Sequence, residues 1–186
     1  MHRIRRFLIA IFLASPVFAF AQQPAEAAQF DFLIGQWQLD VHPKVSSLAA
    51  MIHGAPKLLG TWKAWRTTGG AEIEDEIRIV DASGNPLSSS RSQRTWDAAD
   101  QQWKITGHEL RHGGTSEATG RLQGNEMHLD GHFIDADGTV LTRTRIYDIG
   151  ADGFRMSQDR SHDNGQSWEE GALTIDAKRV SATATP

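Results

Sequence analysis

Few stretches of this chain hold polar residues at spacings that could support chemistry, and one pair stands out. Asp75 and Arg94 lie in two segments of alternating apolar and polar residues, joined by the turn signal Ser83-Gly84-Asn85-Pro86. If that turn pairs its flanking residues symmetrically, the carboxylate and the guanidinium face each other on neighbouring strands. An unpaired buried charge costs several kcal/mol. The pair therefore either braces the protein interior, or Arg94 captures an anionic or carbonyl head group of a ligand.

Further residues share the inward face with this pair. Extending the same pairing through the later hairpins places Thr144, Gln158 and Arg160 on that side of the sheet. Trp62 and Trp103 also face inward, where their rings would line the apolar part of a ligand. We therefore predict a ligand-binding site made of Asp75, Arg94, Thr144, Gln158, Arg160, Trp62 and Trp103.

The histidines do not predict a metal site. In the run Met127-His128-Leu129-Asp130-Gly131-His132, alternation directs the two histidines and the aspartate outward. Residues four apart on a strand are separated by ~13 Å, too far for one metal ion to bind both histidines. His162 is the one histidine that alternation sends inward, either as a haem ligand or as a residue at the mouth that bonds Glu169.

One short motif has a structural interpretation. The spacing Ser161-x-Asp163-x-Gly165-x-x-Trp168 matches the Asp-box hairpin, which sialidase propellers repeat several times. This chain holds a single copy, whereas a propeller needs several. We interpret the motif as a turn in which Asp163 caps the loop, Gly165 takes a positive φ and Trp168 packs beneath.

The elements that must position these residues are strands. From Gly35 the chain alternates strictly, with Trp37, Leu39 and Val41 on one face, which is typical of a half-buried strand. Turn signals recur at intervals of about 12 to 15 residues, as in a β-meander. Ten strands are predicted, over residues 35–42, 60–68, 71–81, 87–96, 102–110, 115–123, 126–135, 139–149, 154–163 and 168–178.

The hairpins agree on which face is buried. Symmetric turns place Asp75 opposite Arg94, Ile73 opposite Trp96 and Trp103 opposite Leu122, and one face stays apolar through nine strands. An open meander would leave exposed edges, so we predict a single closed antiparallel β-barrel. A short helix over 45–52 would lie at its mouth, although an irregular loop fits that segment too. At the other end an apolar floor is expected from Trp37, Trp96, Trp103, Met127, Ile146 and Phe154.

The ends of the chain predict its compartment. Residues 1–21 have a basic start, an apolar run and an Ala19-Phe20-Ala21 cleavage site, as in a secretory signal peptide. Residues 22–29 are expected to form a flexible tether, 30–180 the barrel and 181–186 a disordered tail. The sequence has no cysteine. Removing the leader takes the formal net charge from −4 to −7, which argues against nucleic acid and anionic membranes as partners.

Three segments carry a resemblance to known proteins: Phe30 to Trp37, Arg94 to Asp97 with Gln102-Trp103, and Ser161 to Glu169. They are similar to exported bacterial lipocalin-like domains of unknown function. The order of parts resembles the calycin superfamily, especially the ten-strand barrels of nitrobindin and the fatty-acid-binding proteins. The long glycine-rich first strand of nitrobindin is absent here, which argues against haem.

The resemblance and the residues together favour a periplasmic or secreted barrel that binds a small amphipathic molecule in its lumen. Three alternatives remain open: a haem protein using His162, an isomerase or cyclase with Asp75 or Glu109 as base, and a filled barrel without ligand. The enzyme would need a carboxylate that no arginine neutralises, so Arg94 argues against Asp75. Nothing resembles a nucleophile elbow, a phosphate loop or a Ser/His/Asp triad. No cofactor is predicted.

Overall fold

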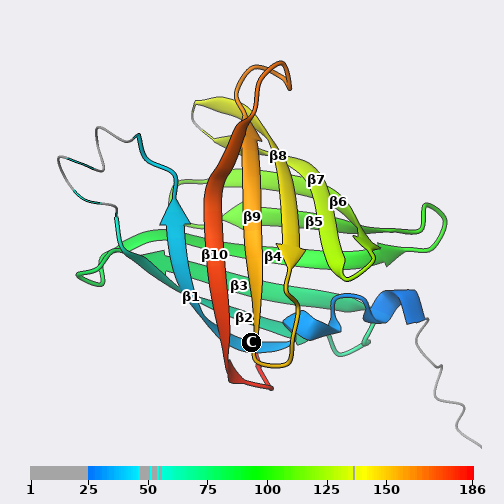
Figure 1. The fold of residues 1–186 in the computed structure, drawn as a ribbon. Helices are drawn as coiled ribbons and strands as arrows, with labels where there is room; N and C mark the ends of the chain where they lie inside the picture. The colour runs from blue at the N-terminus through cyan, green and yellow to red at the C-terminus, as the bar shows by residue number, and fades with distance from the viewer. Residues whose placement is uncertain (1–24, 47–50, 52–53, 55, 136) are drawn as a thin grey trace, which may run out of the picture.

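The structure, a computed structural model, describes residues 25–46, 51, 54, 56–135 and 137–186. These residues form ten antiparallel strands that close into one barrel in the order β1-β10-β9-β8-β7-β6-β5-β4-β3-β2 (Figure 1). The predicted all-β meander barrel is confirmed. The strands are β1 (Gly35–Pro43), β2 (Leu58–Arg66), β3 (Glu72–Val80), β4 (Pro86–Asp97), β5 (Gln102–Glu109), β6 (Gly114–Gln123), β7 (Glu126–Asp135), β8 (Gly138–Tyr147), β9 (Gly153–Ser161) and β10 (Glu169–Ser181).

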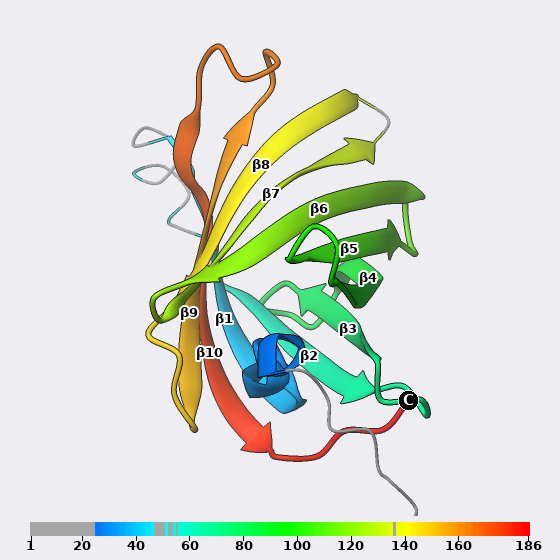
Figure 2. The same ribbon diagram turned by 90° about the vertical axis from the view of Figure 1, so that its right-hand side faces the viewer.

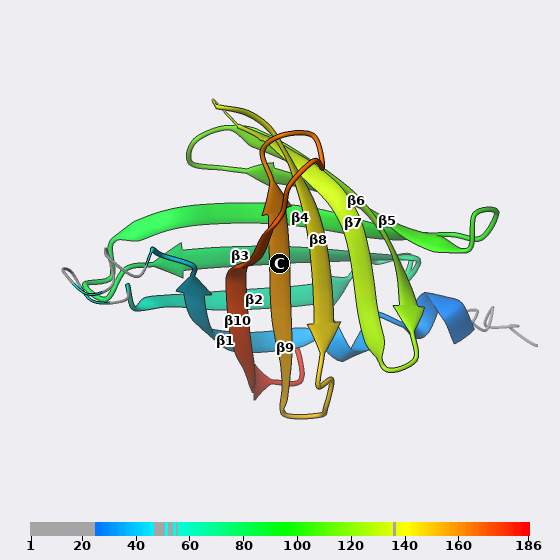
Figure 3. The ribbon, with the colours of Figure 1, turned by 45° about the horizontal axis from the view of Figure 1, so that its top comes forward.

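The strands are strongly tilted. Figure 3 shows β8, β9 and β10 in front running across the direction of β2, β3 and β4 behind them. Such crossing is expected because strands must tilt against the axis for a sheet to close on itself. Because neighbouring strands run in opposite directions, successive turns lie at opposite ends of the barrel.

Most side chains lie on their predicted faces, but two strand pairings are shifted. Asp75 lies opposite Ser92, Arg94 opposite Ile73, and Trp103 opposite Gly120. The predictions that paired Asp75 with Arg94, Ile73 with Trp96, and Trp103 with Leu122 directly were therefore wrong by two residues. A shift of two residues leaves every side chain on its predicted face.

The local cause of the first shift lies in the turn between β3 and β4. The carboxylate of Asp81 accepts hydrogen bonds from the backbone N–H of Ser83 and Asn85 and from the amide of Asn85. Asp81 N–H in turn donates to the carbonyl of Asn85. The turn is thus centred earlier than a symmetric 83–86 turn, and an irregularity between Ile79 and Val80 reduces the resulting offset to two residues.

One end of the barrel is filled by apolar side chains, as the sequence predicts. Trp37, Trp103, Met127, Ile146 and Phe154 are all buried in one cluster. Trp96, the sixth predicted member, is partly buried and packs edge-on against Trp103 at 5.8 Å between ring centroids. This cluster is the floor of the barrel.

The N-terminal segment closes this floor, a role the sequence analysis did not foresee. It forms two short 3-10 helices, η1 (Ala25–Ala28) and η2 (Asp31–Leu33), which Figure 2 shows in front of β1 and β2. Phe30 and Leu33 are fully buried. Phe30 packs edge-on against Trp103 at 5.0 Å, and Trp37 Nε1 donates to the Leu33 carbonyl at 2.8 Å. We call residues 25–34 the floor plug.

Two arginines of the barrel fasten the floor plug to it. Arg179 on β10 donates to the carbonyls of Phe32 and Ile34 at 2.9 and 2.7 Å. Arg66 on β2 donates to the Ala27 carbonyl at 3.0 Å and forms an ion pair with Asp31. Residues from both ends of the chain and from β2 therefore meet at this end.

The described residues cover only part of the segments predicted at the ends of the chain. The signal peptide, and most of the helix expected over 45–52, lie outside the described residues. Within the predicted tether, Ala25–Ala28 form η1 and Ala27 is buried. Among the described residues, no helix combines the length and the hydrophobicity needed to cross a membrane.

Candidate functional site

The lumen above the floor holds a cavity of about 720 Å³. Five of the seven predicted site residues line it, and two do not. Asp75 is fully buried in contact with Arg94, and Trp103 belongs to the floor. The cavity is large enough for a small organic molecule. The lining members of the predicted site are Trp62, Arg94, Thr144, Gln158 and Arg160.

The deepest polar group in the lumen is the ion pair of Asp75 and Arg94. Arg94 Nη1 contacts Asp75 Oδ2, and both residues are buried, with exposed fractions of 5% and 0%. The two are diagonal rather than direct neighbours, and the long arginine side chain bridges that offset. Trp62 Nε1 donates to the second carboxylate oxygen of Asp75 at 3.0 Å. The bracing role that the sequence predicts is therefore present.

Arg94 keeps bonding capacity beyond this pair. Its guanidinium lies over the rings of Phe30 and Trp62, at 5.2 and 5.7 Å from their centroids. Burial lowers the pKa of Arg94 to about 9, so the group still carries its charge at neutral pH. Its Nε is buried and has no hydrogen-bond acceptor among the described residues. A buried N–H group without an acceptor lowers the stability of the folded protein unless water or a ligand accepts its hydrogen bond.

A second polar group lines the opposite side of the lumen. Arg160 Nε donates to Gln158 Oε1 at 2.9 Å, and Gln158 Nε2 donates to Thr144 Oγ1 at 3.2 Å. The Arg160 guanidinium also lies over the Phe133 ring at 5.4 Å. The three predicted residues on β8 and β9 thus form one connected chain. This chain holds Arg160 against the wall of the cavity.

The wall between these two groups is built from small side chains, which the sequence analysis did not single out. Ser88, Ser90 and Ser92 succeed one another on β4, on the same inward face as Arg94. A Cβ added at Gly107 would lie 2.5 Å from Ser116 Oγ and 3.1 Å from Ser92 Oγ. A side chain at position 107 would crowd these two hydroxyl groups on the lumen face. The three serines and Gly107 make a wall of small, hydroxyl-bearing residues.

Glu109 is unsuited to act as a base. Burial raises its pKa, but hydrogen bonds from the backbone N–H groups of Ser89, His112 and Arg111 outweigh that effect and leave the pKa lowered. Its carboxylate organises the turn between β5 and β6. Asp75 is paired with Arg94, so both carboxylates of the isomerase alternative are already held by partners in the protein.

His162 does not reach the lumen. Strand β9 ends at Ser161, which is buried, and His162 is exposed and absent from the cavity lining. The prediction that alternation carries His162 inward is wrong because β9 ends at Ser161, two residues before its predicted end, and His162 already belongs to the Asp-box turn. Three other histidines border the mouth, His108, His112 and His132, although alternation places His132 on the outer face. Among the described residues, no group of three or more His, Asp or Glu side chains is arranged to hold a metal ion.

The Asp-box is a structural turn, as predicted. Asp163 accepts hydrogen bonds from Ser161 Oγ, Ser167 Oγ and Ser167 N–H, and Gly165 has a φ of 86°. Trp168 Nε1 donates to the Gly165 carbonyl at 3.2 Å. The Trp168 ring packs under the guanidinium of Arg143, 3.8 Å from its centroid. These contacts explain the spacing of the motif without a ligand.

The Asp-box predicts a specific acid sensitivity. Hydrogen bonds, chiefly from Ser167 and then Ser161, lower the pKa of Asp163 from 3.8 to about 2. A lowered pKa stabilises the folded state above pH 3.8, and the contribution is lost as the pH falls towards 2. The difference in unfolding free energy between wild type and Asp163→Asn should therefore shrink across this interval. Urea unfolding at a series of pH values measures it, and parallel pH profiles for the two proteins would contradict the assignment.

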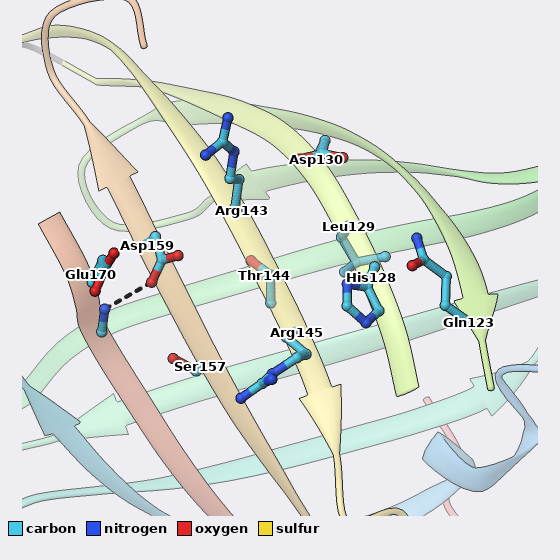
Figure 4. A pocket seen from close by; sticks show the side chains of 11 residues that line it. Gln123, His128, Leu129, Asp130, Arg143, Thr144, Arg145, Ser157, Asp159 and Glu170 are labelled. Carbon is cyan, nitrogen blue, oxygen red and sulfur yellow. Dashed lines mark hydrogen bonds between the residues drawn. The ribbon is translucent and has the colours of Figure 1, made fainter. Parts of the chain in front are cut away.

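A second hollow, of about 500 Å³, lies on the outer face of β7 to β10 (Figure 4). Arg143 on β8 stands between Asp130 and Asp159, its partners on the neighbouring strands. Asp159 also accepts the N–H of Gly171 at 2.8 Å, the dashed line in Figure 4. Charges of opposite sign alternate across this surface. It is consistent with the solvated outer face expected for His128 and Asp130.

A scan against models of known protein families finds no match, and a search of curated proteins finds no significant relative. What the structure establishes is a closed ten-strand antiparallel barrel with a lumen that could bind a small molecule. That architecture is compatible with the calycin fold.

Proposed function

We propose that this protein is an exported, calycin-type barrel that binds a small amphipathic molecule in its lumen. The observation that carries the proposal is Arg94, a buried guanidinium that borders the cavity with an unpartnered Nε–H among the described residues. Leaving such a donor unsatisfied costs about 1–3 kcal/mol. An oxygen of a bound molecule would relieve that cost, and its anionic or carbonyl group would then lie deep in the barrel.

The rest of the lining fits the apolar part of such a molecule. Ile77, Ile146, Met156 and Ile175 face the cavity from β3, β8, β9 and β10, and Trp62 stands beside Arg94. A few polar groups within a mostly apolar concave lining are typical of small-molecule sites. The alternatives are less well supported, since His162 is exposed, both candidate bases are occupied and the lumen is not filled by side chains.

Export is proposed from residues 1–21 alone. The leader would be removed after Ala21, so that the mature chain begins at Gln22. The intact mass of protein recovered from the periplasm or the medium of a producing cell checks this point. A chain that keeps its first 21 residues would contradict it.

Filling part of the lumen should weaken binding while leaving the fold intact. The neutral fluorophore N-phenyl-1-naphthylamine gains emission in apolar surroundings and reports entry into the cavity. Ser92 faces the lumen and Thr106 faces outward on the neighbouring strand, so Ser92→Phe and Thr106→Phe form a matched pair. We expect the affinity to fall at least tenfold in Ser92→Phe and to stay unchanged in Thr106→Phe. Wild-type protein that does not bind the fluorophore would contradict the proposed function, as would equal binding by both variants.

A further inference from the structure

The charges around Arg94 determine which kind of ligand oxygen can accept a hydrogen bond from it. The single positive charge of Arg94 is already offset by Asp75, and both groups are buried. Asp75 is held in place by Trp62, which donates to its other oxygen. The deepest polar group of the lumen is therefore neutral overall, although it still offers an unpartnered Nε–H.

The surroundings of the pair add no further charge. The strand partners of Arg94 are Ile73 on β3 and Ile105 on β5, and the rings of Phe30 and Trp62 lie against its guanidinium. The other cavity-lining arginine, Arg160, lies on β9, five strands away from β4 in either direction around the barrel. Arg160 belongs to that opposite wall, where its Nε donates to Gln158.

We propose that the molecule bound in the lumen presents a neutral carbonyl oxygen, of a ketone, ester or amide, to Arg94, and not a carboxylate. This inference rests on the proposed binding function and narrows its ligand class. A carboxylate placed beside Arg94 would give the buried site a net negative charge and would lie close to Asp75. Its binding would cost desolvation energy that no unpaired cation offsets. A carbonyl oxygen accepts the Nε–H bond and leaves the site neutral.

The adjoining wall indicates the shape of the molecule that bears this carbonyl. Ser90 and Ser92 continue from Arg94 along β4, and Gly107, which lies opposite Ser92 on β5, adds no side chain to this wall. Small side chains on this wall leave room for a flat frame, whose opposite face would contact Ile146 and Met156. A planar apolar ring system with a carbonyl substituent fits both features.

A matched pair of compounds tests the preference directly. 2-Acetylnaphthalene and 2-naphthoate share one flat frame and differ in the head group, which is a neutral ketone in the first and a carboxylate, ionised at pH 7, in the second. In isothermal titration calorimetry, we expect wild-type protein to bind the ketone at least tenfold more tightly than the acid. 2-Naphthamide, which is neutral and isosteric with the acid, should follow the ketone.

Removing the charge of Asp75 should shift the preference towards the acid. Asp75→Asn keeps an oxygen for the Trp62 N–H but leaves the Arg94 charge without a counterion, so the ratio of affinities should move at least tenfold towards 2-naphthoate. Asp130→Asn, which removes an exposed carboxylate from the outer face, should leave the ratio unchanged. The comparison in wild-type protein stands even if Asp75→Asn fails to fold.

The outcomes separate this inference from the function on which it rests. Tighter binding of 2-naphthoate by wild-type protein, or equal binding of both compounds, would overturn the neutral-carbonyl preference and leave the binding function in place. Uptake of N-phenyl-1-naphthylamine with no binding of either naphthyl compound would also overturn the preference. Failure of all the compounds, the fluorophore included, would instead overturn the proposed function.

Discussion

Replacing Asp75 with alanine is expected to lower the free energy of unfolding by about 3–5 kcal/mol, because it leaves the Arg94 charge buried without a partner. The same substitution removes the acceptor of the Trp62 indole N–H, which is itself buried. Chemical denaturation followed by tryptophan fluorescence measures the loss. Asp130→Ala, an exposed aspartate on the outer face, is the matched control and should change the unfolding free energy by no more than about 0.5 kcal/mol.

A double-mutant cycle shows whether the effect belongs to the pair. Arg94→Met alone leaves the Asp75 carboxylate without its counterion and should destabilise by a similar amount. Making both changes together removes both buried charges, so the double variant should be clearly more stable than the sum of the two losses predicts. Strict additivity would mean that the two charges do not interact, and the bracing role would then be wrong.

Replacing Phe30 with alanine is expected to cost about 3–5 kcal/mol, the usual range for deleting a fully buried aromatic ring. Phe30 is fully buried, packs edge-on against Trp103 and lies over the guanidinium of Arg94. Its loss would therefore leave a cavity beneath the ion pair as well as loosen the floor plug. The same denaturation experiment measures the change.

Phe32 supplies the control for this second prediction. It belongs to the same plug and lies 5.8 Å from Phe30 between ring centroids, but it is only partly buried. Phe32→Ala should therefore cost distinctly less than Phe30→Ala. If neither substitution lowers the unfolding free energy by more than about 1 kcal/mol, the N-terminal segment does not close the barrel, since core truncations normally cost more.

The faces of the barrel could be predicted from the sequence because alternation is a property of each strand. The side chains of Trp62, Asp75 and Gln158 all point inward as their positions in the pattern require. The two errors in pairing did not change which face a side chain lies on, because each was an offset of two residues. This is why Asp75 and Arg94 meet although they are not direct partners.

The exact pairing could not be predicted because it depends on turn contacts. The position of the β3–β4 turn is fixed by the Asp81 carboxylate and its bonds to Ser83 and Asn85. Nothing in the alternating pattern distinguishes that turn from one centred a residue later. The same holds for the start of the Asp-box turn at Ser161, which takes His162 out of the lumen.

The floor plug was missed for a different reason. Phe30 to Leu33 is too short to show any periodicity, and its position depends on bonds from Arg66 and Arg179, which are remote in the sequence. A paired Phe-x-Phe-Leu just ahead of the first strand was the available signal. The unpartnered Nε–H of Arg94 likewise becomes visible only when the floor plug and the neighbouring strands are in place.

The most direct test of this account is the Nε–H resonance of Arg94 in a nitrogen–proton correlation spectrum, assigned by its loss in Arg94→Lys. We expect a signal that exchanges slowly with water in the free protein, as burial requires, and that shifts on addition of 2-acetylnaphthalene as the ketone oxygen accepts its hydrogen bond. A rapidly exchanging signal, or one that stays in place while the ketone binds, would show that Arg94 does not receive the ligand.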